Sequence, residues 1–228
     1  MSLWGLENYE EYLDLLTNNP VRFQEFLKKL TINVSEFFRN PERYMDLWET
    51  FLPQLLKERP KIKIWSAGCS NGAEPYSVAI ILNELSALSR ATIVGTDIDT
   101  TVLAKAQAGV YGDNEVKSLP AELLEKYFRE DKGYYYLSDR IIEAVTFKKQ
   151  NLLLDEFDED FDLIICRNVV IYFTEEAKNE LYKKFYRSLR PGGYFLVGGT
   201  EPLLNYKALG FENTASSFYK KIVAVDEG

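Results

Sequence analysis

Histidine is absent from this chain of 228 residues, and cysteine occurs only twice. Without histidine, the chain lacks the commonest general base near neutral pH and the commonest zinc ligand, and we expect no metal site. Its chemistry must therefore use carboxylates, arginine, lysine, tyrosine, cysteine or a bound cofactor. The N-terminus shows no pattern typical of an export signal, which favours a reducing cytoplasm and two free thiols.

Long apolar runs are also missing. No stretch approaches the roughly 18 apolar residues that a membrane span needs, so we expect no insertion into a membrane. The formal net charge of −8 disfavours non-specific binding of nucleic acid as the main task. Hydrophobic residues make up 46% of the chain, enough for a sizeable core. The length fits one large α/β domain or a domain with a small appendage, and we expect a monomer.

The first part of the chain has the apolar spacing of helices. Such spacing recurs from Leu6 to Leu16, and it predicts a second amphipathic helix from Val21 to Leu30. A third helix is predicted from Glu42 to Leu56, with Pro41 opening it, because proline is favoured at the first helical position. Residues 1–58 are therefore predicted to be a helical segment and linker.

From residue 59 onward, predicted strands alternate with predicted helices. The predicted strands are Ile62–Trp65, Ala91–Thr96, Phe161–Cys166 and Tyr194–Val197, and the predicted helices are Tyr76–Leu85, Thr100–Ala108, Leu123–Phe128 and Glu175–Leu189. This alternation implies a parallel sheet with right-handed crossovers. A terminal hairpin from Phe211 to Val223 should add antiparallel strands at one edge.

A tyrosine-rich stretch interrupts this alternation near residues 132–147. We predict a small antiparallel hairpin there, with a turn at Ser138-Asp139, that feeds a strand ending near Gln150. The acidic run from Asp155 to Asp162 is predicted to be a solvated loop.

A glycine turn follows the first predicted strand. Gly68 and Gly72 bracket a loop of small residues, and Glu74 with Pro75 opens the next helix. In doubly wound α/β folds, a nucleotide-like ligand lies across this turn, and glycine allows its close approach. The loop is not a phosphate-binding loop, because it has no Gly-Lys-Ser/Thr and Glu74 would repel a phosphate. A carboxylate here suits a ligand that carries positive charge.

Polar residues also follow the other predicted strands. Asp97 ends the second strand, where an acidic residue can accept hydrogen bonds from both hydroxyls of a ribose. An alternative is that Asp97 caps the next helix. Asn151 and the pair Arg167-Asn168 end two further strands, and Tyr172 lies four residues beyond Asn168. Such a gathering marks the ligand crevice of a parallel sheet.

Five stretches together are similar to one known family. In order, they are Asn33–Arg39, Ala67–Ser77, Thr96–Asp99, Gln150–Leu152 and Cys166–Phe173. In motif sequence, order and spacing, the chain resembles the chemotaxis receptor methyltransferases of the CheR type, from about Leu6 to Lys221. The family usually has a longer N-terminal helical domain, so residues 1–58 match only its last part.

This resemblance implies an α/β fold, namely a Rossmann-like S-adenosylmethionine methyltransferase domain over residues 59–228 with a small antiparallel β-insert. The family methylates glutamate side chains in the cytoplasmic domains of membrane chemoreceptors. Arg39 and Tyr172 match residues beside the transferred methyl group, and the implied cofactor contacts are Asn33, Ser35, Arg39, Gly68, Glu74, Asp97, Asn151, Leu152, Arg167 and Asn168.

Several roles remain open at the level of the sequence. Arg39 could hold the substrate carboxylate or the carboxylate of the cofactor, because its planar fork suits either. Tyr172 could place its ring near the sulfonium or pack in the core. Glu74 could bond the methionyl ammonium or another donor group of the cofactor. Two rival functions are a methyltransferase of another carboxylate substrate and a non-catalytic sensor that binds the cofactor.

Overall fold

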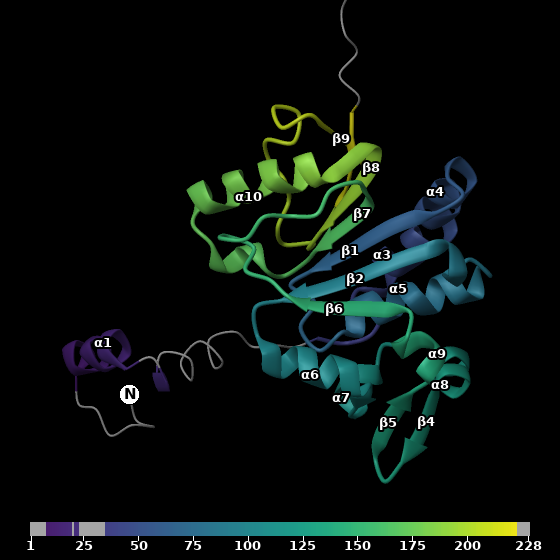
Figure 1. The fold of residues 1–228 in the computed structure, drawn as a ribbon, viewed down its shortest axis with the longest axis horizontal. Helices are drawn as coiled ribbons and strands as arrows, with labels where there is room; N and C mark the ends of the chain where they lie inside the picture. The colour runs from purple at the N-terminus through teal and green to yellow at the C-terminus, as the bar shows by residue number, and fades with distance from the viewer. Residues whose placement is uncertain (1–7, 20, 23–34, 223–228) are drawn as a thin grey trace, which may run out of the picture. The chain divides into compact units, whose positions relative to one another are not determined.

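The computed structural model describes residues 8–19, 21–22 and 35–222. Within these residues, the largest element is a seven-stranded sheet with strand order β6-β2-β1-β7-β8-β10-β9 (Figure 1). Neighbouring strands from β6 to β8 pair in parallel, and β10 and β9 pair antiparallel at one edge. The strand bounds are β1 Ile62–Ala67, β2 Ala91–Asp97, β6 Val145–Lys149, β7 Phe161–Cys166, β8 Leu189–Val197, β9 Phe211–Ala215 and β10 Phe218–Lys221. The predicted parallel sheet and its terminal hairpin are confirmed.

The order of the sheet creates a switch point beside β1. From β1 the chain builds outward through β2 to β6, and it then returns to the other side of β1 to add β7 and β8. Ligands bind at such a switch point, outside the carboxyl ends of the strands. β7 is buried at all six of its positions, as expected for a parallel strand that is covered on both faces.

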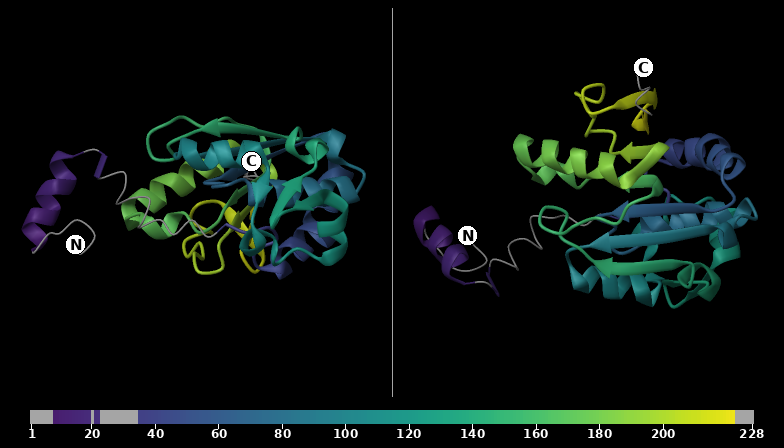
Figure 2. Two further views of the ribbon diagram at one scale, coloured as in Figure 1. Left: turned by 90° about the horizontal axis from the view of Figure 1, so that it is seen from below. Right: turned by 45° about the horizontal axis from the view of Figure 1, so that its top comes forward.

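Helices cover both faces of this sheet. The helix bounds are α5 Ala73–Glu84, α6 Thr100–Ala108, α7 Asp113–Val116, α8 Ala121–Tyr127, α9 Asp139–Ile142, α10 Glu175–Ser188 and the 3-10 turns η3 Leu88–Arg90 and η4 Val170–Tyr172. Ile64 of β1 packs in the same core cluster as α5, whereas its neighbour Trp65 packs with α10. Successive residues of a strand point to opposite faces, so the two cores lie on opposite sides of the sheet (Figures 1 and 2).

The predicted helix from Glu42 to Leu56 is helical throughout, but its middle is a π-helix. The chain runs through α3 Pro41–Asp46, the π-segment η2 Leu47–Phe51 and α4 Leu52–Glu58. Proline lacks an N–H group, so Pro53 cannot donate the helical bond of its position, and the wider turn before it accommodates this loss. Helix α1, Tyr9–Asn18, agrees with the first predicted helix. Most of the predicted helix Val21–Leu30 lies outside the described residues.

The small antiparallel sheet is present, but its turn is not where the sequence predicted it. Its strands are β3 Val110–Tyr111, β5 Tyr134–Leu137 and β4 Phe128–Asp131, with β5 in the middle. The hairpin turn is Lys132-Gly133, where φ is 52° and 77°. Two consecutive residues with positive φ match the right-handed twist of a hairpin. The predicted turn at Ser138-Asp139 is wrong, because Ser138 precedes the short helix α9.

The acidic run from Asp155 to Asp162 is only partly a solvated loop. Asp162 lies in β7 and is 1% exposed, which corrects the prediction for that residue. Its carboxylate accepts a hydrogen bond from the Lys63 N–H at 2.7 Å and lies 2.9 Å from Nε of Arg59. A buried carboxylate needs such partners, and a strand from elsewhere in the chain supplies one of them.

Residue contacts divide the chain into two compact units, Met1–Val34 and Ser35–Gly228. Helices α3 and α4 therefore belong to the same unit as the sheet. The assignment of residues 1–58 to a separate helical segment stays a prediction. Among the described residues, no helix combines the length and the apolar character that crossing a bilayer requires.

Candidate active site at the switch point

The glycine turn after β1 fits between two other segments. Gly68 has a φ of 74°, and a Cβ there would lie 2.4 Å from a methyl group of Val169. Gly72 has a φ of 83°, and a Cβ there would lie 2.8 Å from Cβ of Ala106 in α6. Both positions need glycine for backbone conformation and for space. The turn therefore places backbone without side chains at the carboxyl ends of β1 and β7.

Asp97 at the end of β2 orders this turn. Its Oδ2 accepts a hydrogen bond from the Ser70 N–H at 2.8 Å, and its Oδ1 accepts one from the Asp99 N–H at 3.0 Å. The cap of α6 is Asp99, which accepts a hydrogen bond from the Thr101 N–H, so the alternative role of Asp97 as the helix cap is wrong. Burial raises the pKa of Asp97, and the backbone N–H groups oppose this shift.

The buried Arg167 and the partly buried Glu74 form an ion pair beside the turn. Oε2 of Glu74 lies 3.6 Å from Nη1 of Arg167, and Oε1 accepts a hydrogen bond from the Ser66 hydroxyl at 2.8 Å. Burial raises the pKa of Glu74, while the charge of Arg167, the Ser66 bond and the charge of Arg39 act against that shift. The helix α5 and the end of β7 therefore bring together two residues that are predicted to bind the cofactor.

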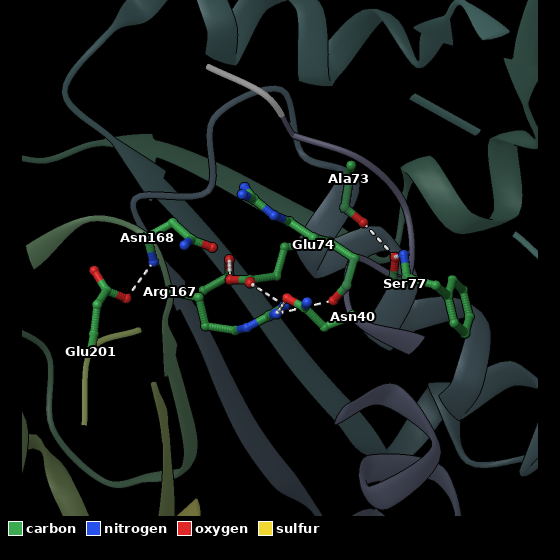
Figure 3. A network of polar contacts seen from close by, with 10 residues as sticks. Asn40, Ala73, Glu74, Ser77, Arg167, Asn168 and Glu201 are labelled. Atoms are coloured by element: carbon green, nitrogen blue, oxygen red, sulfur yellow. Dashed lines mark hydrogen bonds and ion pairs between the residues drawn. The ribbon is translucent and has the colours of Figure 1, made fainter. Parts of the chain in front are cut away.

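Arg167 also holds the segment that precedes α3. Its Nη2 donates a hydrogen bond to Oδ1 of Asn40 at 2.6 Å (Figure 3). The same Nη2 donates to the backbone oxygen of Arg39 at 3.0 Å. The Arg167 side chain is 3% exposed. Within the part of the chain that the structure describes, its buried Nε has no hydrogen-bond partner. Buried polar groups are rarely left without one, so this N–H group suits a ligand acceptor.

The turn after β7 presents Asn168 and Tyr172. Asn168 adopts a φ of 59°, and Tyr172 ends the 3-10 turn η4 with 46% of its surface exposed. Tyr172 is therefore not a packed core residue. The buried Glu201 accepts hydrogen bonds from the N–H groups of Asn168 and Ile171. Glu201 was not among the residues predicted for the site, although a carboxylate shortly after the fifth parallel strand is a signal of the kind that indicated Asp97.

The loop after β6 adds Asn151 and Leu152. The Gln150 N–H donates to the backbone oxygen of Asp97 at 2.9 Å, so this loop lies next to the end of β2. Asn151 uses its side-chain oxygen to accept a hydrogen bond from the Leu153 N–H, and Leu152 is 7% exposed in the core on the α10 side.

Most residues predicted for the site lie at one end of the sheet, at the last residue of β2 or on the segments that follow β1, β6 and β7. Ser35 is partly buried at the start of the unit that contains the sheet. Asn33 lies outside the described residues.

These features fit a zwitterionic, nucleoside-bearing cofactor. Asp97 offers a carboxylate at the ribose position, and the buried Nε of Arg167 has no acceptor among the described residues. In the described ranges, no group of three or more His, Cys, Asp or Glu side chains is arranged to hold a metal ion.

The doubly wound sheet and its switch-point site fit a methyltransferase that depends on S-adenosylmethionine. A solved structure of a possible exported protein from Bordetella parapertussis shares the fold, with a TM-score of 0.51 and 16% identity over 80% of this chain and 68% of that one. The family model "CheR methyltransferase, SAM binding domain" matches residues 33–219. The chain therefore belongs to the CheR methyltransferase family.

Relatives named chemotaxis protein methyltransferase align over most of this chain. The one from Listeria monocytogenes is 37% identical over 93% of this chain and 82% of its own length. The one from Borreliella burgdorferi is 36% identical over 95% and 81%. The one from Escherichia coli is 33% identical over 86% and 71%. These alignments confirm the family that the sequence motifs indicated.

Proposed function

We propose that this chain transfers a methyl group from S-adenosylmethionine to glutamate side chains in the cytoplasmic domains of membrane chemoreceptors. The product is a glutamyl methyl ester, and the chain acts as a cytoplasmic monomer. The observation that carries this proposal is the family match over residues 33–219, which includes every residue predicted for the site. The names of the aligned relatives support the link to chemotaxis.

The chain's own residues suit this reaction. The cofactor supplies an electrophilic methyl group on a sulfonium. A glutamate side chain has an ordinary pKa of about 4.3, so it is already a nucleophile at neutral pH and needs no general base. The absence of histidine is therefore no obstacle. The protein has to align the two reactants and remove water from their opposite charges.

Each site residue has a role in that alignment. Asp97 accepts hydrogen bonds from the ribose, and Arg167 with Glu74 binds the polar end of the cofactor. Arg39 binds a carboxylate, and Tyr172 places its ring near the sulfonium, a cation–π contact worth roughly 0.5–2 kcal/mol. In support, the charges of Arg39 and Arg167 both act on Glu74, and Tyr172 is half-exposed.

A methyl-transfer assay tests the function. Purified receptor cytoplasmic fragments are incubated with the chain and with methyl-labelled S-adenosylmethionine, and alkali-labile label on the receptor is measured. We expect label on receptor glutamates, and none on a matched fragment whose methylation-site glutamates are replaced by glutamine. Label that goes only to small carboxylic acids would support the first rival function. Cofactor binding without turnover on any receptor would support the sensor.

Asp97→Ala should weaken cofactor binding by roughly 1–3 kcal/mol, the scale of lost hydrogen bonds to a charged group. Isothermal titration with S-adenosylhomocysteine measures this change. Asp158→Ala is a matched control, because the Asp158 side chain is 58% exposed on a different loop. Unchanged affinity in Asp97→Ala would remove Asp97 from the cofactor site.

The pH dependence gives a second test of Asp97. Burial raises its pKa above the ordinary value of 3.8, so it becomes protonated at a higher pH than a solvated aspartate. The ionised form accepts the hydrogen bonds, so wild-type affinity should fall as the pH falls through this raised pKa. The ratio of wild-type to Asp97→Ala affinity should therefore shrink toward acidic pH. A constant ratio would contradict the proposed role.

A further inference from the structure

A single buried carboxylate links the loops that follow β7 and β8. Glu201 lies four residues beyond the end of β8 and is 6% exposed. Its Oε2 accepts a hydrogen bond from the Asn168 N–H at 2.6 Å, and its Oε1 accepts one from the Ile171 N–H at 3.2 Å (Figure 3 shows the first). Each carboxylate oxygen thus holds a different N–H group of the same turn.

The shape of this turn depends on those two bonds. Asn168 has a left-handed backbone with a φ of 59°, which costs energy for a residue other than glycine and persists only where its surroundings fix it. A carboxylate can accept from both N–H groups, and such charge-assisted bonds are about twice as strong as neutral ones. An amide at position 201 has one oxygen, so its NH2 group would face one of the two donors.

Gly198 keeps the space for this carboxylate. A Cβ at Gly198 would lie 2.2 Å from Oε2 of Glu201 and 3.2 Å from the backbone nitrogen of Asn168. Any side chain there would displace the carboxylate from the Asn168 N–H. The Glu201 N–H also donates to the backbone oxygen of Gly198 at 3.0 Å, which closes a tight turn. Gly198 and Glu201 therefore act together on the loop after β7.

We propose that Glu201 is a positioning residue for methyl transfer, held in place by Gly198, that sets the turn from Asn168 to Tyr172. This inference rests on the proposed function, because Asn168 and Tyr172 have their roles there. Tyr172 directly follows Ile171, whose N–H Glu201 holds, so the carboxylate fixes the backbone from which the Tyr172 ring projects. Glu201 itself acts through these two residues.

Glu201→Gln tests the proposal with almost no change in shape. We expect kcat to fall on the order of 100-fold, the scale for a misplaced site group, while KM for the receptor fragment changes little. Affinity for S-adenosylhomocysteine should fall severalfold, because Asn168 moves. Glu212→Gln is the matched control, since Glu212 is exposed on β9 and should keep wild-type values.

The amide proton of Asn168 gives a direct readout. A backbone N–H that donates to a carboxylate resonates far downfield in a proton–nitrogen spectrum. In Glu201→Gln, we expect this resonance to move upfield and to lose protection from hydrogen exchange. Thermal unfolding of the same samples shows what fraction is folded, so that kcat is expressed per folded molecule.

Gly198→Ala disrupts the contact between the Asn168 N–H and Glu201 while it keeps the Glu201 carboxylate. It should reproduce the losses in kcat and cofactor affinity and the shift of the Asn168 resonance. Because both changes break one contact, the double variant should lose little more than either single variant. Additive losses would show two independent effects and would overturn the joint role of Gly198 and Glu201.

The outcomes separate this inference from the proposed function. If Glu201→Gln lowers only the melting temperature and keeps wild-type kcat and cofactor affinity per folded molecule, Glu201 is merely structural and the inference is overturned. If the wild-type chain methylates no receptor fragment, the proposed function fails. In that case, Glu201→Gln still tests the inference through cofactor affinity and the Asn168 resonance. If both stay at their wild-type values, the inference is overturned as well. If both change, Glu201 remains a positioning residue for cofactor binding.

Discussion

Arg167→Met should lower the free energy of unfolding by up to about 3–5 kcal/mol, because it removes the buried arginine that supplies the main opposite charge beside Glu74. Glu74 would keep the bond from the Ser66 hydroxyl and the charge of Arg39, whose effect on its pKa is smaller than that of Arg167. The backbone oxygen of Arg39 and Oδ1 of Asn40 would also lose their donor. Urea unfolding at neutral pH measures the change. Arg187→Met is the control, since Arg187 is exposed on α10 and its loss should have little effect.

The cause of this loss can be checked with a double variant and with pH. Glu74→Gln in the Arg167→Met background removes the unpaired charge and should recover part of the stability. In Arg167→Met, the pKa of Glu74 should lie further above its unfolded value, because the larger of the two opposing positive charges is gone and only that of Arg39 remains. When folding raises the pKa of a carboxyl group, the free energy of unfolding of the protein falls as the pH rises from the unfolded pKa to the folded pKa. The deficit should therefore be smallest at acidic pH, and a pH-independent deficit would contradict an electrostatic cause.

The sequence predicted the strand ends well because hydrophobic pattern and turn chemistry agree there. β7 is apolar except for Asp162 and is followed by Arg167-Asn168, and Gly68 follows the last residue of β1, so the sequence indicates where both strands end. Parallel pairing then brings the residues after each strand to the same edge of the sheet. For this reason, Asp97, Glu74 and Arg167 could be predicted as one site.

Contacts between distant residues could not be predicted in the same way. Asp162 reads as the end of an acidic run, but its burial depends on Arg59 and on β1, about a hundred residues earlier in the chain. The partner of Glu74 is Arg167, and no local pattern indicates this pairing. Glu201 follows a run of small residues, and its role becomes visible only when its oxygens are seen on the Asn168 and Ile171 N–H groups.

The small sheet was misplaced for a local reason. Lys132-Gly133 and Ser138-Asp139 are both acceptable turn sequences, and the turn was predicted at the second. In the structure the turn is Lys132-Gly133. Both residues adopt positive φ, and the paired strands β4 and β5 flank them. Ser138 instead precedes α9, because serine is common at the residue before a helix as well as in turns. The π-segment before Pro53 was not predicted either, because apolar spacing does not report which backbone hydrogen bonds a helix makes.

Arg39→Ala should reduce turnover on the receptor by roughly 10²- to 10³-fold, the usual loss when one oriented donor at a reacting centre is removed. The backbone oxygen of Arg39 accepts a hydrogen bond from Arg167, and truncating the side chain leaves that bond in place. The fold should therefore persist, which thermal unfolding can confirm. Steady-state kinetics with the receptor fragment measure kcat and KM. Wild-type kinetics in this variant would exclude Arg39 from the reaction.

Ligand binding to the same variant decides which carboxylate Arg39 holds. S-adenosylhomocysteine carries an amino-acid carboxylate, and 5′-methylthioadenosine lacks it. If Arg39 binds the cofactor, Arg39→Ala weakens binding of the first ligand and leaves binding of the second unchanged. If Arg39 binds the substrate glutamate, both affinities stay at the wild-type level while kcat/KM for the receptor falls. Arg39→Lys separates charge from geometry, because a point charge cannot make the two parallel hydrogen bonds of a guanidinium. Full activity in Arg39→Lys would show that charge alone is sufficient at this position.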